Sequence, residues 1–258
     1  MSSDRRERQK AGRTAAREAK RKAESRKELW RRVRLGLGIG VSVAVVLLFT
    51  GVLSSGGPEV ADTYLAFRDL PTACGADAPD SLTPMQFEAP DESPVAGRIE
   101  AVIATSCGPI TVELDPSISP LSVASFVFLA REGYYDGTVF HRIASDFVIQ
   151  GGDQTASGTG NPGYRIANEF PEAGFAYERG VVAMAKGSGP GTTGSQFFIV
   201  TGEDAANLSA SFNVLGRVVD GFDALDRITA VPTTRQPNSP ENSRPLEAVY
   251  VEGITVEG

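Results

Sequence analysis

The sequence contains one histidine and two cysteines in 258 residues. These side chains are the usual zinc ligands, and a metal site needs several of them together. Two cysteines and the distant His141 do not form such a set, so we expect no metal site and no other cofactor. His141 also lacks a recognisable serine, cysteine or carboxylate partner, and a catalytic triad needs all its roles filled. We therefore interpret His141 as structural support.

An alternating series of strand-like and helix-like segments is also absent, as is any internal repeat, and this disfavours a dinucleotide-binding fold. The glycine-rich stretch 187–194, GSGPGTTG, lacks the lysine of a phosphate-binding loop and precedes a strand-like segment instead of a helix. We expect no bound nucleotide. These glycines are interpreted as a tight turn beside a binding groove.

Acidic residues are scarce at the N-terminus. Residues 1–34 carry 14 Lys and Arg against 5 Asp and Glu, whereas the remaining residues carry 11 against 27. Such a basic arm can bind nucleic acid. Next to a membrane span it is better suited to the anionic inner leaflet, where each basic residue contributes about 1 kcal/mol. We favour the membrane interpretation and expect no nucleic-acid partner.

Charged residues are absent from residues 35–53, LGLGIGVSVAVVLLFTGVL. As a helix this run would be about 28 Å long, enough to cross a bilayer core. Arg31, Arg32 and Arg34 precede it, so the positive-inside rule places residues 1–34 in the cytoplasm and the C-terminal part outside. A cleaved signal peptide is the alternative, but its charged region would be unusually long. We predict an uncleaved, single-pass transmembrane helix in the cell membrane.

Residues 54–97 are rich in Pro, Ser, Gly and acidic residues, a composition typical of a tether. Within them, residues 60–70 have the pattern of a short helix. Thiols outside the cytoplasm tend to oxidise, and an even number of cysteines allows one pairing. We predict a disulfide between Cys74 in the tether and Cys107 in the first hairpin of the folded domain. The alternative is two unrelated thiols.

The folded domain is predicted for residues 98–258. Ser119 is the expected N-cap of a helix that begins at Pro120 and ends at Gly133, and residues 220–228 have the pattern of a second helix. Short strand-like segments with mostly turn-like connections indicate a mainly β domain, a closed eight-stranded antiparallel barrel with two helices. The strand-like segments are 99–105, 110–115, 138–143, 147–150, 180–185, 196–200, 213–219 and 248–256.

Three stretches resemble the signature blocks of the cyclophilins, which are peptidyl-prolyl cis-trans isomerases (rotamases). They are FHRIASDFVIQGGD at 140–153, MAKGSGPGTTGSQFFI at 184–199 and NLSASFNVLGRV at 207–218. The blocks follow the family's order and spacing within residues 98–257. The resemblance implies a barrel capped at its ends by two helices, and an enzyme that accelerates rotation about X–Pro bonds. It implies nothing about residues 1–97.

By this resemblance Arg142 is the catalytic residue, a guanidinium that hydrogen-bonds the nitrogen of the twisted peptide bond. An apolar cup would hold the proline ring. Gln150 would bind the substrate backbone, Gln196 would orient the arginine or the neighbouring chain, and Ala185 would offer backbone groups. The implied substrate-binding residues are Phe147, Val148, Gln150, Ala185, Lys186, Gln196, Phe198, Leu208 and Phe212.

Four positions depart from the family pattern. Val148 stands where many members have methionine, and Lys186 stands where asparagine is frequent. Asn207 and Phe212 occupy positions that hold tryptophan and histidine in well-studied eukaryotic members. These differences imply a smaller cup with a charge nearby, and weak binding of cyclosporin.

Two functions are consistent with these residues. The first is a membrane-tethered, monomeric isomerase that acts on proline-containing polypeptides outside the cytoplasm. The second is a non-catalytic proline-binding adaptor or holdase on the same fold. The presence of Arg142 favours the enzyme, because an adaptor gains little from a cation at the rotating bond.

Overall fold

The computed structural model describes residues 59–90, 97–236 and 239–258. The predicted basic tail (1–34) and the predicted membrane span (35–53) lie outside these ranges. Within the described ranges, no helix is both long enough and apolar enough to cross a bilayer.

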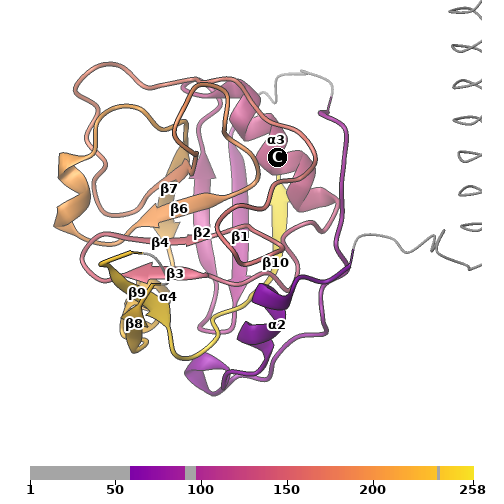
Figure 1. Ribbon diagram of the computed structural model, residues 1–258. Helices are drawn as coiled ribbons and strands as arrows, with labels where there is room; N and C mark the ends of the chain where they lie inside the picture. Colours follow the sequence, from indigo (N-terminus) through magenta and orange to yellow (C-terminus); the bar gives the residue numbers. More distant parts are fainter. Residues whose placement is uncertain (1–58, 91–96, 237–238) are drawn as a thin grey trace, which may run out of the picture. The chain divides into compact units, whose positions relative to one another are not determined.

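Eight strands form one curved antiparallel sheet with the order β10-β1-β2-β7-β5-β6-β4-β3 (Figure 1). Each of the eight segments predicted from the sequence contains or overlaps one of these strands, so the mainly β architecture is confirmed. The strands are β1 (Ile99–Thr105), β2 (Ile110–Leu114), β3 (Arg142–Ala144), β4 (Val148–Gly151), β5 (Val181–Met184), β6 (Phe197–Val200), β7 (Val214–Asp220) and β10 (Val251–Glu257).

The sheet curls toward a barrel, with β10 and β3 at the two ends of the strand order. Backbone segments next to these strands meet in an isolated antiparallel bridge between Val139 and Tyr250. Beside the bridge, the N–H of Phe140 donates to the carbonyl of Val249 at 2.9 Å. The two ends of the sheet are thus linked locally, while closure along whole strands stays a prediction.

Three α-helices accompany the sheet among the described residues: α2 (Asp62–Arg68), α3 (Pro120–Arg131) and α4 (Phe222–Thr229). The two helices predicted for the folded domain agree with α3 and α4, which Figure 1 shows toward opposite ends of the sheet. The Ser119 hydroxyl does not cap α3 but donates to the carbonyl of Glu169. The carboxylate of Glu169 instead accepts two backbone N–H groups in the first turn, which complements the helix dipole.

The main core lies between α3 and the inner face of the sheet. Buried and half-buried positions alternate along β1 and β2, because successive strand residues point to opposite faces. From α3, Phe126 packs edge-on against Phe197 of β6, with ring centres 5.6 Å apart. Burying one such side chain contributes about 1.5–3 kcal/mol. This packing fixes β6, which carries part of the candidate site.

The described part of the predicted tether, residues 59–90, packs against the domain. Tyr64 and Phe67 of α2 are buried in a cluster with Val139 and Tyr250. The composition predicted a tether here, whereas the structure shows this stretch packed on the domain, and the short helix expected at 60–70 agrees with α2. The difference arises because these aromatic side chains find an apolar surface beside β10, and their burial offsets the entropy cost of ordering the segment.

Cys74 and Cys107 form the predicted disulfide, with their Cα atoms 5.2 Å apart. The bond joins the short 3-10 helix η1 (Ala73–Gly75) to the turn between β1 and β2. Next to it, the N–H of Ala73 donates to the carbonyl of Ala248 at 2.9 Å. A covalent link and a hydrogen bond therefore hold the same stretch against the domain.

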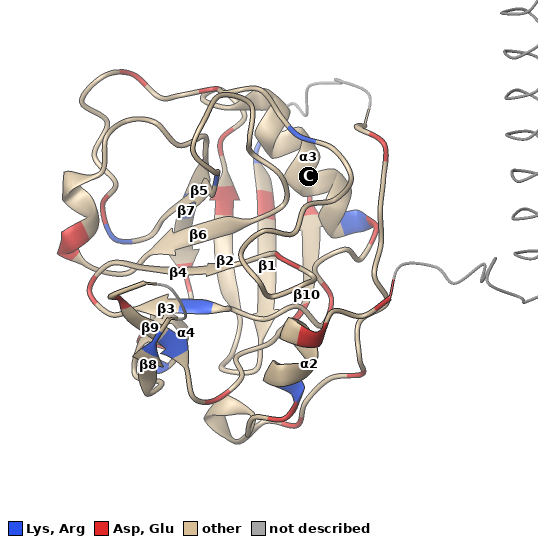
Figure 2. Ribbon diagram, in the orientation of Figure 1, with Lys and Arg blue, Asp and Glu red and all other residues tan. Residues whose placement is uncertain are grey.

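A second sheet, not predicted from the sequence, consists of β8 (Thr233–Arg235) and β9 (Asn242–Pro245). The Pro, Asn and Ser residues of 232–245 have the pattern of turns, so the sequence gives no strand signal there. β9 contacts β3. Figure 2 shows a basic position on β3 next to this hairpin, and Arg142 is the one basic residue of that strand.

Replacing both cysteines by serine should lower the free energy of unfolding by about 3–4 kcal/mol in the chain-entropy model, because the bond closes a loop with a sequence separation of 33. Urea titration of the wild type and of Cys74→Ser/Cys107→Ser measures the difference. The double variant has no thiol left, so a reducing agent should destabilise the wild type only. Equal stability of the oxidised wild type and the double variant would contradict this prediction.

Candidate active site

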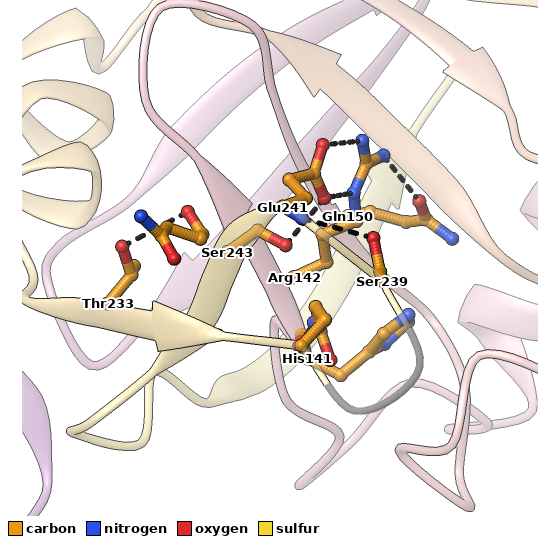
Figure 3. A network of polar contacts seen from close by, with 9 residues as sticks. His141, Arg142, Gln150, Thr233, Ser239, Glu241 and Ser243 are labelled. Carbon is orange, nitrogen blue, oxygen red and sulfur yellow. Dashed lines mark hydrogen bonds and ion pairs between the residues drawn. The ribbon is translucent and has the colours of Figure 1, made fainter.

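The guanidinium of Arg142, at the start of β3, is the centre of a polar network (Figure 3). Its Nε and Nη2 each donate to one carboxylate oxygen of Glu241, both at 2.7 Å. Its Nη1 donates to Oε1 of Gln150 at 3.2 Å. A guanidinium has five N–H groups. Among the described residues these bonds engage three of them, which leaves one N–H on Nη1 and one on Nη2.

Two glutamines extend this network across the sheet. Arg142 lies opposite Gln150 in the pairing of β3 with β4. Nε2 of Gln150 donates to Oε1 of Gln196 at 3.0 Å, and Nε2 of Gln196 donates to the carbonyl of Gly160 at 3.1 Å. Gln196 therefore reaches the arginine through Gln150, and each amide has a fixed orientation.

An apolar cluster borders the guanidinium. The ring of Phe147 faces it, with the Cζ atom of Arg142 at 5.3 Å from the ring centre. Deeper in the cluster, Phe198 of β6 is buried and meets Phe212 edge-on at 5.3 Å. All the apolar side chains that the resemblance assigned to substrate binding belong to this cluster: Phe147, Val148, Ala185, Phe198, Leu208 and Phe212.

Val148 and Lys186, two of the departures from the family pattern, have different surroundings. Val148 is buried, so its side chain belongs to the base of the cluster. The ammonium group of Lys186 lies 5.7 Å from the ring centre of Phe170 and 5.5 Å from that of Phe212. An ammonium group near an aromatic face is attracted by the ring quadrupole. The positive charge expected beside the groove is therefore held against two rings.

Two cavities lie beside these residues. One of about 680 Å³ is lined by Arg142, Gln150 and Glu241, together with residues of α2 such as Phe67. Another of about 330 Å³ is lined by Gln150 and by Ala185, Lys186 and Gln196. Gln150 borders both cavities, whereas Arg142 borders only the larger one.

His141 precedes the arginine and is buried. Burial lowers the pKa of its imidazole to about 4; the charge of Asp153 opposes this shift and that of Arg142 adds to it. The ring is therefore neutral at neutral pH. Its Nδ1 has no hydrogen-bond partner among the described residues. The side chain lines the larger cavity. The described residues contain no metal-binding group of three or more His, Cys, Asp or Glu side chains.

Glu241 and Ser243 were missed by the sequence patterns. Glu241 is 99 residues from Arg142 in the sequence, in a stretch that has only turn signals. The hydroxyl of Ser243 donates to its Oε2 at 2.5 Å. The hydrogen bonds from Arg142, helped by Ser243 and opposed by partial burial, hold the pKa of Glu241 below its usual value. No local pattern reveals this pairing, since only the fold of β9 beside β3 brings the two residues together.

The family model for cyclophilin-type peptidyl-prolyl cis-trans isomerases matches residues 101–256. The chain belongs to the cyclophilin family. Peptidyl-prolyl cis-trans isomerase B of Streptomyces anulatus is 40% identical to this cyclophilin over 181 residues, which cover 63% of the chain and 99% of that protein. A probable peptidyl-prolyl cis-trans isomerase A of Mycobacterium leprae is 40% identical over 172 residues, with 60% and 91% covered.

A solved structure with the same fold is that of a Cryptosporidium parvum cyclophilin-type peptidyl-prolyl cis-trans isomerase, determined in the presence of the dipeptide Ala-Pro. Its TM-score is 0.55 at 30% identity, and the match covers 62% of this chain and 99% of that one. Together with the family match, these relatives give the enzyme class. This cyclophilin is a peptidyl-prolyl cis-trans isomerase.

The buried, neutral His141 should make stability depend on pH. Its folded-state pKa of about 4 lies below the usual 6.5, so between these values the unfolded chain binds a proton that the folded chain does not. Stability should therefore fall as the pH drops from 6.5 toward 4, by on the order of 1–3 kcal/mol. Urea titrations at pH 7 and pH 5 should show a larger difference for the wild type than for His141→Gln. The same difference in both proteins would contradict a neutral buried imidazole.

Proposed function

We propose that this cyclophilin accelerates rotation about X–Pro bonds by using Arg142 to stabilise the twisted bond while the apolar cluster holds the proline ring. One observation carries the proposal. The guanidinium is fixed by Glu241, Gln150 and the ring of Phe147, and still has an N–H group on each Nη atom without a partner among the described residues. These donors lie beside an apolar cluster that suits a proline ring.

The chemistry needs no nucleophile. A peptide bond resists rotation by about 18–20 kcal/mol, because the nitrogen lone pair is delocalised into the carbonyl group. In the twisted bond the lone pair is localised on nitrogen and can accept a hydrogen bond. A donor fixed at that position binds the twisted bond more tightly than the planar one. Lowering the barrier by about 7 kcal/mol accelerates exchange by about five powers of ten.

Proline-containing polypeptides are the substrate class that this site suits. The structure of the Cryptosporidium parvum relative was determined in the presence of a proline-containing dipeptide, Ala-Pro, which supports this substrate class. In this chain, Phe147 and Phe198 offer apolar surface for such a ring, and the glutamine pair offers amide groups to a peptide backbone. The cavities on either side leave space for the flanking residues of a longer chain.

We further infer that the substrates are exported proteins, and that the chain is a monomer anchored by residues 35–53 with its domain outside the cytoplasm. Two observations support this location. The uncharged run follows a strongly basic segment. The Cys74–Cys107 disulfide requires oxidised thiols, which persist outside the cytoplasm.

Arg142→Ala should lower kcat/KM for an X–Pro peptide at least tenfold, a loss of about 1.4 kcal/mol of transition-state stabilisation, while peptide affinity changes less. Exchange measured by NMR on the purified full chain gives both quantities. Arg179→Ala is the matched control, because Arg179 also pairs with a carboxylate (Asp226) and also lies 5.3 Å from an aromatic ring (Phe222). If Arg142→Ala isomerises the peptide as fast as an active wild type, the arginine mechanism is wrong. If neither protein isomerises it, a non-catalytic adaptor or holdase is favoured.

Protease added to spheroplasts that express the full chain should remove the folded domain and leave residues 1–53 in the membrane, because the proposed topology exposes only the C-terminal part. Cleavage near residues 91–96 is not sufficient to release the domain, since the disulfide still joins Cys74 to Cys107. The fragments should therefore be resolved with and without a reducing agent. Recovery of intact protein from the soluble fraction would contradict the anchor.

A further inference from the structure

Glu241 makes the closest contacts to the guanidinium of Arg142, although nothing in the sequence pattern pointed to it. The two side chains form a two-point ion pair in which both carboxylate oxygens accept an N–H at 2.7 Å. They are partly buried, with exposed fractions of 25% for Arg142 and 34% for Glu241. A pair with this geometry fixes the plane of the guanidinium, which a single hydrogen bond does not.

Glu241 is itself held in place. The hydroxyl of Ser243 donates to its Oε2 at 2.5 Å, and the N–H of Gln236 donates to its backbone carbonyl at 2.9 Å. The side chain of Gln236 donates in turn to the carbonyl of His141, next to the arginine, at 3.2 Å. The β8–β9 hairpin therefore bonds both to the backbone that precedes Arg142 and to its side chain.

The carboxylate binds the guanidinium from the side away from Gln150. Figure 3 shows Glu241 and Gln150 on opposite sides of the arginine head group. The Nε–H and an Nη2–H donate to Glu241, and an Nη1–H donates to Gln150. The ring of Phe147 lies against the face of the guanidinium. The remaining N–H on each Nη atom is not used by either residue. This arrangement orients the arginine without occupying every donor that a substrate needs.

We propose that Glu241 is a positioning residue for catalysis, which holds the guanidinium of Arg142 at the site of bond rotation before the substrate binds. The inference rests on the proposed role of Arg142. An unheld arginine side chain samples many rotamers, and each binding event must then select the productive one. The ion pair makes this selection in the free enzyme, so its loss reduces kcat more than it raises KM.

The test is Glu241→Gln in the full chain. This variant keeps the shape of the side chain but removes its charge and one of its two acceptors. We expect kcat to fall about fivefold to tenfold while KM changes less than twofold. Glu113→Gln is the matched control, because Glu113 also pairs with an arginine (Arg98) at 2.7 Å and lies outside the site. Ser243→Ala, which removes only the support of the carboxylate, should give a smaller loss of kcat.

A second readout does not depend on activity. The Nε–H of Arg142 should give a shifted and exchange-protected NMR signal, identified by its absence from Arg142→Ala. In Glu241→Gln this signal should lose its shift and protection, whereas in Glu113→Gln it should be unchanged. The expected combination is loss of the protected signal together with the selective loss of kcat.

Three results would overturn the inference. An unchanged kcat in Glu241→Gln would show that the arginine needs no such partner. A higher kcat would show that the carboxylate competes with the substrate. An unchanged Nε–H signal would show that the ion pair does not fix the side chain. Loss of activity in Arg142→Ala with full activity in Glu241→Gln would reject the role of Glu241 alone, while full activity in both would reject the arginine mechanism as well.

Discussion

The antiparallel pairing of β3, β4 and β6 is the constraint on which the site depends. It places Arg142 opposite Gln150 and Gln150 opposite Phe198. Residues directly opposite each other in such a ladder project from the same face of the sheet, so the guanidinium, the amide and the ring lie on one side. A slip of one residue would send these side chains to the other face. Buried residues on the opposite face of the strands hold the register. Ile143 and Ile149, for example, pair with each other in the core.

The row of polar side chains Arg142, Gln150 and Gln196 is stable next to an apolar cluster because its buried amide groups have hydrogen-bond partners. Gln196 is nearly inaccessible, yet its amide bonds to Gln150 and to the carbonyl of Gly160. The loop that carries Gly160 is organised by Asp153, whose carboxylate accepts the N–H groups of Gly158 and Gly160. An unpaired amide in this position would cost about 1–3 kcal/mol. The same bonds that remove this cost also fix the donors that face the groove.

The sequence predicted most of the sheet, because its strands alternate strongly or are continuously apolar and are separated by turn residues. It predicted α3 from the start signal at Pro120 and the stop signal at Gly133, and α4 from the helical pattern of residues 220–228. The motif resemblance grouped Phe147, Phe198, Leu208 and Phe212, and the structure places them in one cluster. These predictions depend on local patterns or on the spacing between motifs, and both can be recognised in the sequence.

What the sequence did not reveal depends on contacts between distant segments. The sequence around Glu241 does not distinguish it from other acidic residues. It pairs with Arg142 only because β9 packs against β3. The packing of residues 59–90 was hidden by their Pro, Ser and acidic composition, since a few aromatic side chains decide whether such a segment is ordered. Glu169, as the cap of α3, was also missed because a nearby serine occupied the expected position.

The stretch that contains α2 and Cys74 forms part of the wall of the site. The family match begins at residue 101, so α2 lies outside it. Residues of α2 nevertheless line the cavity that contains Arg142 and Glu241. The hydroxyl of Thr63 donates to the carbonyl of Thr155 at 2.5 Å, and the disulfide fixes the chain at Cys74, shortly after α2. A part of the chain whose composition suggests a linker therefore supplies one wall beside the arginine, and the bond at Cys74 helps to keep that wall in place.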